Sequence, residues 1–166
     1  MKYGLKIYKM LFPKNVTLKS LVLTFIQFLI LFFLFLQVIN GGFPSVLSLV
    51  FYFFSIFLGV SAVYAMRNAN FNIVPNVSDD SIMVTNGIYK FIRHPMYSSL
   101  LFFALGVVIN LHDMLTMALF VFLLVDLYLK ASYEEKELCK KHKNYVDYMQ
   151  SSDRFFPVKF VIRVKL

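Results

Sequence analysis

The feature that most constrains this chain is a long stretch without charge. No Asp, Glu, Lys or Arg occurs between Ser20 and Met66, and turn-forming residues interrupt the stretch only at Asn40-Gly41-Gly42 and Pro44. A membrane-spanning helix needs about 20 mainly apolar residues, so we expect two membrane helices, at about 21–39 and 46–66. A cleaved signal peptide is the alternative for the first, but its apolar stretch is too long and no small-residue cleavage site follows.

Composition points the same way. The chain has 166 residues, of which 59% are hydrophobic and 16% are charged, where a soluble domain carries about 25% charged residues. The net charge of +8 could indicate nucleic acid, anionic lipid or an acidic ligand, and the apolar content argues against nucleic acid. The single cysteine, Cys139, excludes an internal disulfide framework, and we interpret it as incidental.

A second apolar block covers residues 96–129 and is interrupted by a polar cluster of Asn110, His112 and Asp113. This pattern predicts a helical hairpin. Each arm has about 15 residues, or about 22 Å of helix, which is short for a full span. The hairpin is therefore expected to be tilted, kinked or partly submerged.

The placement of positive charge predicts the orientation. All 17 Lys and Arg residues lie in segments 1–19, 67–93 and 130–165. The positive-inside rule then places both termini and the middle loop in the cytoplasm. We predict an all-α integral membrane helical bundle with four membrane segments, two spans plus a helical hairpin, and a cytoplasmic C-terminal helix; in a bacterium the membrane would be the inner one.

Polar residues that could support chemistry are concentrated in segments 67–97 and 130–157, on the same face. In the first segment, Arg93 and His94 precede Pro95, which suits the first turn of a helix. Free N–H groups at that helix start, together with the two cationic side chains, would favour a carboxylate or phosphate. The alternative is a simple anchor for lipid headgroups.

In the second segment, Asp126, Lys130 and Glu134 recur every four residues and share one helix face. An ionisable residue inside an apolar segment usually has a partner or a function, and for Asp126 an ion pair with Lys130 is the simpler interpretation. Glu134 and Glu135 could be a solvated helix start, with Ser132 and Glu135 as a capping box.

The residues that follow indicate an amphipathic helix over 133–149. Its apolar face would carry Leu138, His142, Tyr145 and Met149 at helical spacing. The sequence leaves open whether this helix is continuous with the last membrane helix.

A series of short motifs occurs along the chain in a definite order. The motifs are Asn70-Phe71-Asn72, Val84-Thr85-Asn86-Gly87-Ile88-Tyr89, Arg93-His94-Pro95-Met96-Tyr97, the hydrophobic hairpin, Glu134-Glu135, Tyr145, Tyr148 and Arg154-Phe155-Phe156-Pro157. Their order resembles the isoprenylcysteine carboxyl methyltransferase family, with related phospholipid methyltransferases, over about residues 67–157. The resemblance implies that residues 1–66 are a basic segment with two membrane helices, 67–157 the methyltransferase core and 158–166 a basic tail.

The resemblance implies an S-adenosyl-L-methionine-dependent enzyme whose cofactor enters from the cytoplasm and whose lipid-like or prenylated acceptor enters from the bilayer. It implies cofactor contacts from Ser81, Ile82, Met83, Val84, Tyr89, His94, Pro95, Met96, Tyr97 and Glu134. Lys130 stands where the prenylcysteine enzymes have an arginine that contacts the substrate carboxylate. The resemblance also implies a supporting role for Arg93, Glu135 and Asp126, which would hold the contacting side chains in place without touching the cofactor themselves.

Several functions stay open at this stage. Carboxylate O-methylation is favoured, and phospholipid amine N-methylation is the alternative, for which His142 or Glu135 would be the candidate bases. No metal is required, because the sulfonium is already a good leaving group. From other classes, a proton-coupled exporter using Asp126 or a non-catalytic membrane scaffold would also fit the hydropathy.

Overall fold

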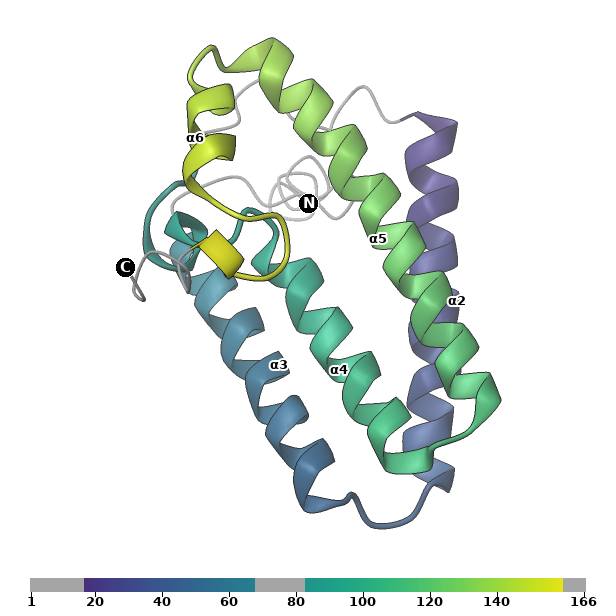
Figure 1. Ribbon diagram of the computed structural model, residues 1–166. Helices are drawn as coiled ribbons and strands as arrows, with labels where there is room; N and C mark the ends of the chain where they lie inside the picture. The colour runs from purple at the N-terminus through teal and green to yellow at the C-terminus, as the bar shows by residue number, and fades with distance from the viewer. Residues whose placement is uncertain (1–16, 68–82, 160–166) are drawn as a thin grey trace, which may run out of the picture.

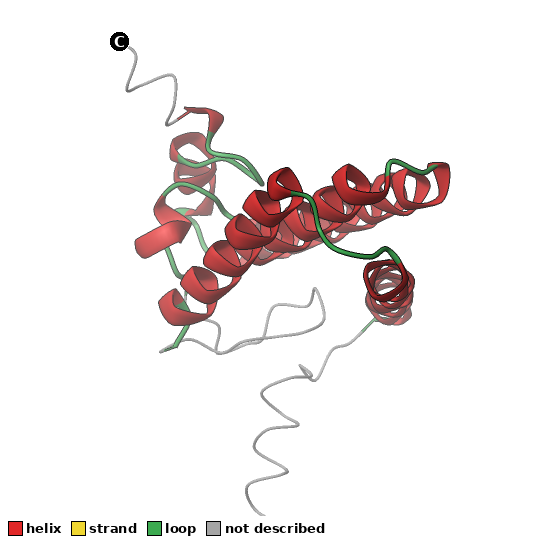
Figure 2. Cartoon of the chain, turned by 90° about the horizontal axis from the view of Figure 1, so that it is seen from below, coloured by secondary structure: helices red, strands yellow, loops and turns green. Residues whose placement is uncertain are grey.

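The computed structural model describes residues 17–67 and 83–159, and Figure 2 shows helices joined by loops, with no strand among these residues. The elements, labelled in Figure 1, are α2 (Leu18–Asn40), α3 (Val46–Ala65), the 3-10 helix η1 (Gly87–Lys90), α4 (Pro95–Leu111), α5 (Met114–Lys141) and α6 (Tyr145–Ser151).

The two expected N-terminal membrane helices are present as α2 and α3. Each begins at a hydroxyl N-cap, with Thr17 Oγ1 accepting from Ser20 N at 3.2 Å and Ser45 Oγ accepting from Ser48 N at 3.2 Å. Many large apolar side chains on both helices are exposed, as lipid-facing surfaces require. Helices α2, α3 and α5 are long and apolar enough to cross a membrane.

The predicted hairpin is confirmed at its turn. His112 ends α4 in the left-handed region, with φ of 53°, and Asp113 caps α5 by accepting from Leu115 N at 2.9 Å and Thr116 N at 3.0 Å. The expected arm length was wrong for the second helix, since α5 has 28 residues. No glycine or proline interrupts 114–141, and the strong helix formers after Lys130 extend α5 beyond its apolar part.

The C-terminal region differs from the expectation in two places. Ser132 Oγ donates to Tyr128 O at 2.8 Å within α5, so the Ser132–Glu135 capping box does not form. The amphipathic helix expected over 133–149 is interrupted at His142, whose φ and ψ of −117° and 109° end α5. The chain resumes as α6, so the last apolar helix is continuous with 133–141 but not with Met149.

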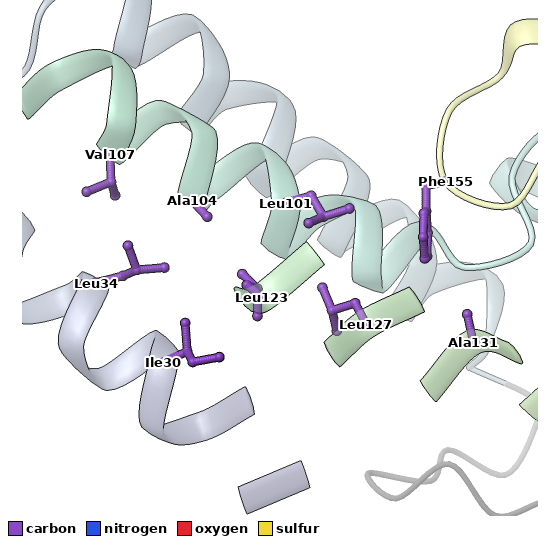
Figure 3. Packing of buried hydrophobic residues seen from close by; sticks show 9 residues of the cluster. All are labelled: Ile30, Leu34, Leu101, Ala104, Val107, Leu123, Leu127, Ala131 and Phe155. Carbon is purple, nitrogen blue, oxygen red and sulfur yellow. The ribbon is translucent and has the colours of Figure 1, made fainter. Parts of the chain in front are cut away.

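The core lies between α2, α4 and α5 (Figure 3). Its buried members are Ile30, Leu34, Leu101, Ala104, Val107, Leu123, Leu127, Ala131 and Phe155. The α2–α3 and α4–α5 connections lie at one end of the bundle, opposite the start of α4 and α6 (Figure 1). The described parts of the segments expected to carry chemistry, 83–97 and 130–157, therefore lie toward the other end.

Helices α3 and α4 pack closely through small residues. A Cβ added to Gly106 would lie 2.6 Å from Cε1 of Tyr52, and Ser99 Oγ donates to Ser55 O at 2.8 Å. The ring of Tyr52 is also 5.8 Å from that of Phe103. Because protein interiors tolerate little extra volume, the position of α4 against α3 depends on the missing side chain of Gly106.

We predict that Gly106→Ala lowers the free energy of unfolding by about 1–3 kcal/mol, because the new methyl group overlaps the Tyr52 ring. Thermal unfolding in detergent measures the change. In a Tyr52→Leu background the same substitution should cost much less. An equal cost in both backgrounds would contradict the contact.

Candidate active site

The start of α4 is held against the C-terminal segment by backbone pairing. Ile92 and Asp153 form an isolated parallel bridge, in which Arg93 N donates to Asp153 O at 2.8 Å and Asp153 N donates to Phe91 O at 3.0 Å. His94 N donates to Arg154 O at 3.1 Å. The Arg93-His94 and Arg154-Phe155 motifs, far apart in sequence, are thus direct neighbours.

Glu135 is the buried charge that holds this junction together, with 4% of its side chain exposed. Its Oε1 accepts from Arg93 Nε at 2.8 Å, and its Oε2 accepts from Arg154 Nη2. Arg93 also donates to the carbonyls of Met149 and Ser152. The solvated helix start expected for Glu135 is therefore wrong, and Arg93 binds structural partners through its Nε and Nη1 groups.

His94 lies between two carboxylates. Its Nδ1 is 3.3 Å from Glu134 Oε2 and its Nε2 is 3.3 Å from Glu135 Oε1. Its ring stacks on Tyr97, with centroids 5.4 Å apart and planes at 4°. Burial lowers the pKa of His94, but hydrogen bonds and charge from Glu134 and Glu135 outweigh it, and the net pKa is raised.

Glu134 differs from its neighbour because it stays accessible. Its side chain is 21% exposed, against 4% for Glu135. Tyr97 Oη donates to Glu134 Oε1, so the carboxylate is oriented by a tyrosine and a histidine while one side remains open. A partly exposed, oriented carboxylate beside aromatic rings can accept from hydroxyl or ammonium groups of a ligand.

Lys130 is held by α2 rather than by Asp126. Its Nζ donates to Gln27 Oε1 at 2.5 Å and to Thr24 Oγ1 at 3.4 Å, and it lies 5.6 Å from the centre of the Tyr97 ring. The expected Asp126–Lys130 ion pair is not formed. Among the described residues, neither carboxylate oxygen of Asp126 has a hydrogen-bond partner.

Tyr89 closes the site from η1. Gly87 starts this turn with φ of 57°, a conformation that favours glycine. Tyr89 Oη donates to Met66 Sδ at 2.9 Å, and Tyr148 Oη donates to Tyr89 O at 2.5 Å. Burial, followed by the charge of Glu134, raises the pKa of Tyr89.

The strand-like run 81–84 is described only in part. Met83 and Val84 are half-buried and have no regular secondary structure. Ser81, Ile82 and the Asn70-Phe71-Asn72 motif lie outside the described residues. The structure thus brings His94, Tyr97, Glu134 and Lys130 together, with Tyr89 close by.

The comparison with known families gives a match to the isoprenylcysteine carboxyl methyltransferase (ICMT) family over residues 46–140, more than half of the chain. The chain belongs to this family. The matched range starts with α3, which the motifs alone did not include, and ends within α5. Membership in the ICMT family and the three long apolar helices support an integral membrane methyltransferase. No curated protein matches the chain.

Sequence reasoning missed the contribution of α2 to this region of the ICMT-family protein. Thr24 and Gln27 are buried in an apolar helix and both bind Lys130. The sequence does contain a signal for this polar pair, since two polar side chains three residues apart in an apolar span share one helix face. Identifying their partner, however, requires knowing that α2 packs against α5.

We predict that Glu135→Gln lowers the free energy of unfolding by about 3–5 kcal/mol, because Arg93 and Arg154 lose the carboxylate that neutralises them. Chemical or thermal unfolding in detergent measures the effect. The matched control is Glu137→Gln, which removes an exposed ion pair with Lys140 and should leave stability unchanged. Similar losses in both variants would contradict the role of Glu135.

The raised pKa of His94 predicts a pH-dependent stability. An unfolded histidine titrates near about 6.5, so a higher folded value means that protonated His94 stabilises the fold. That contribution is complete below about pH 6.5 and is lost as pH rises through the folded pKa. The stability difference between the wild type and His94→Gln should therefore shrink as pH rises above about 6.5. A constant or growing difference would contradict the protonated assignment.

Proposed function

We propose that the protein transfers a methyl group from S-adenosyl-L-methionine to a membrane-embedded lipid-like or prenylated acceptor, by O-methylation of a carboxylate. The observation that carries this proposal is the oriented Glu134 carboxylate, which contacts Tyr97 and His94 and has Lys130 one helical turn away along α5. An acidic group for the cofactor and a cation for the acceptor thus share one helix face.

The residues present fit the cofactor in their chemistry. When bound, S-adenosyl-L-methionine supplies a methyl group activated by its sulfonium charge. Glu134 would accept from cofactor hydroxyl or ammonium groups, and Tyr89 and Tyr97 would provide aromatic walls. The proposed cofactor contacts are Met83, Val84, Tyr89, His94, Pro95, Met96, Tyr97 and Glu134, with Ser81 and Ile82 included from the motif.

The first turn of α4 suits the carboxylate end of the cofactor. Its N-cap residue, His94, makes no side-chain capping hydrogen bond to the described residues, and Pro95 occupies the first helical position. The N–H groups of Met96 and Tyr97 are then the first donors of the helix, at its partially positive end. The Nε and Nη1 groups of Arg93 are not assigned to the cofactor, since they donate to Glu135 and to two backbone carbonyls.

Lys130 would orient the acceptor. It is 1% exposed and lies within α5, a helix able to cross the membrane. Thr24 and Gln27 hold its ammonium group in place, which would fix the acceptor carboxylate relative to the methyl group. A carboxylate is ionised near neutral pH, so its methylation needs no general base. His142 lies two turns beyond Glu134 and has no role in this scheme.

Orientation in the membrane is part of the proposal. The candidate site lies at the end of the bundle opposite the two connections, α2–α3 and α4–α5, which contain no Lys or Arg (Figure 1). The positively charged segments 1–19, 67–93 and 130–165 support a cytoplasmic site and cytoplasmic termini by the positive-inside rule. A soluble cofactor would then reach Glu134 from the cytoplasm while the acceptor reaches Lys130 from the lipid.

Binding of S-adenosylhomocysteine to the purified protein in detergent tests the cofactor assignment. We expect saturable binding by the wild type and at least about tenfold weaker binding by Glu134→Ala and by His94→Ala, since each loses a charged or hydrogen-bonding contact. Isothermal titration calorimetry measures the affinity.

The matched control is Glu137→Ala, which removes an exposed carboxylate one turn further along α5 and should bind as the wild type does. Absence of binding by folded wild type would overturn the proposed function. Equal binding by wild type and both site variants would overturn the residue assignment while leaving methyl transfer standing.

A further inference from the structure

The outer face of α5, which points away from the core, changes from apolar to basic along the helix. Its apolar part carries side chains that are at least 45% exposed, namely Val121, Phe122, Val125, Tyr128 and Leu129. In steps of three or four residues, which keep to one helix face, it continues with Ser132, Lys136, Cys139 and Lys140. An apolar surface that ends in basic side chains matches the two parts of a lipid, its chains and a negatively charged head group.

An open pocket lies where the basic part of this face begins. Its volume is about 530 Å³, and it is formed between α5 and the segment around α6, which lies beside the C-terminal end of α5 (Figure 1). The residues that line it include Ser132, Glu135, Lys136, Lys140, Met149 and Arg154. Three of these six side chains are cationic, so the pocket suits an anion.

The pocket keeps its positive charge although a carboxylate lines it. Glu135 is bound by Arg93 Nε at 2.8 Å and by Arg154, so its charge is neutralised within the junction. Lys136 is exposed and forms no ion pair with the described residues. Lys140 forms only an exposed ion pair within α5, of a kind that contributes little energy. Both lysines are therefore available to an anionic ligand.

Arg154 is a fixed cation at the membrane end of the pocket. Its Nη1 donates to Ser132 Oγ at 3.1 Å, and its guanidinium carbon lies 4.7 Å from the centre of the Tyr128 ring. The side chain stays 25% exposed. Guanidinium groups bind phosphates well, and tyrosine is typical of the boundary between the hydrocarbon and the head groups. These contacts place the pocket at the depth of a lipid phosphate.

The pocket is separate from the candidate active site. Ser132 is two residues from both Lys130 and Glu134, and two residues turn a helix by about 200°. Lys130 and Glu134 contact Gln27 and Tyr97 within the bundle, whereas Ser132 belongs to the outer face. A molecule bound in this pocket would therefore lie on the opposite side of α5 from the proposed methyl transfer.

We propose that this pocket binds the head group of an anionic phospholipid of the phosphatidylglycerol type, whose acyl chains lie along the apolar part of the outer face of α5. Arg154 and Lys136 would bind the phosphate, with Lys140 reaching it from the next turn. The lipid would be a resident ligand rather than the methyl acceptor. Because Arg154 also binds Glu135, the bound lipid would stabilise the junction between α5 and the C-terminal segment.

Matched lipids test this site on the purified protein in detergent. Dioleoylphosphatidylglycerol and dioleoylphosphatidylcholine have the same chains and a phosphate but differ in net charge, and native mass spectrometry over a titration of each gives its affinity. We expect the wild type to bind the anionic lipid at least about tenfold more tightly, because cations surround the phosphate. Glycerophosphoglycerol, the same head group without chains, should bind at least about tenfold more weakly than the whole lipid.

A pair of double variants separates the pocket from general attraction to positive charge. Lys136→Gln/Lys140→Gln should weaken binding of dioleoylphosphatidylglycerol at least about tenfold and leave binding of dioleoylphosphatidylcholine unchanged. The matched control is Lys90→Gln/Lys143→Gln, which removes the same charge from exposed lysines outside the pocket and should bind as the wild type does. All four lysines are exposed, so both variants should fold, which thermal unfolding checks.

Three results would overturn the inference. The first is equal affinity of the wild type for the two lipids. The second is an equal loss, or no loss, in the two double variants, because either would mean adsorption without a site. The third is glycerophosphoglycerol binding as tightly as the whole lipid, which would assign the pocket to a soluble anion. None of these measurements uses S-adenosylhomocysteine, so they decide the lipid site whether or not the proposed function holds.

Discussion

The arrangement depends on one buried carboxylate. Glu135 binds Arg93 before α4 and Arg154 after α6, so a single side chain on α5 fixes the relative positions of three chain segments. Each of these charges would be costly to bury separately, and each is acceptable because the others are present. His94 is placed by the same contact, since its Nε2 reaches Glu135 while its Nδ1 reaches Glu134. The paired glutamates therefore divide their roles: one assembles the junction, and the other stays accessible.

The contacts of Glu135 explain why the Arg93-His94-Pro95 motif and the Arg154-Phe155 motif lie side by side. The Arg93-His94-Pro95 motif looks like an anion site when read alone, because a helix start with two cationic side chains favours anions. In the structure Arg93 instead donates hydrogen bonds to Glu135 and to two backbone carbonyls. The C-terminal Arg154-Phe155 segment completes the junction through backbone pairing and through Phe155, which packs into the core. The assembled group, rather than any single motif, creates the open side of Glu134.

The sequence was a good guide wherever one helix determined the outcome. Uncharged apolar length predicted α2 and α3, and the cluster around His112 predicted the hairpin turn. It failed where partners came from other helices. Local spacing favoured an Asp126–Lys130 pair and a Ser132–Glu135 cap, but α2 supplies the partners of Lys130 and α5 simply continues through Ser132. Four-residue spacing places two side chains on one face, and packing between helices decides whether they touch each other or something else.

Spacing along α5 also has a consequence for chemistry in a membrane. Side chains four residues apart on one helix face are separated by about 6 Å along the axis, and the Glu135 junction holds α5 against Arg93 and Arg154. Gln27 and Thr24 add a second constraint by holding the flexible Lys130 side chain against α2. If methyl transfer depends mainly on alignment, the protein needs fixed distances between its binding groups more than it needs a reactive residue. The polar side chains on one face of α5, from accessible Glu134 to buried Asp126, are held at such fixed distances by the helix itself.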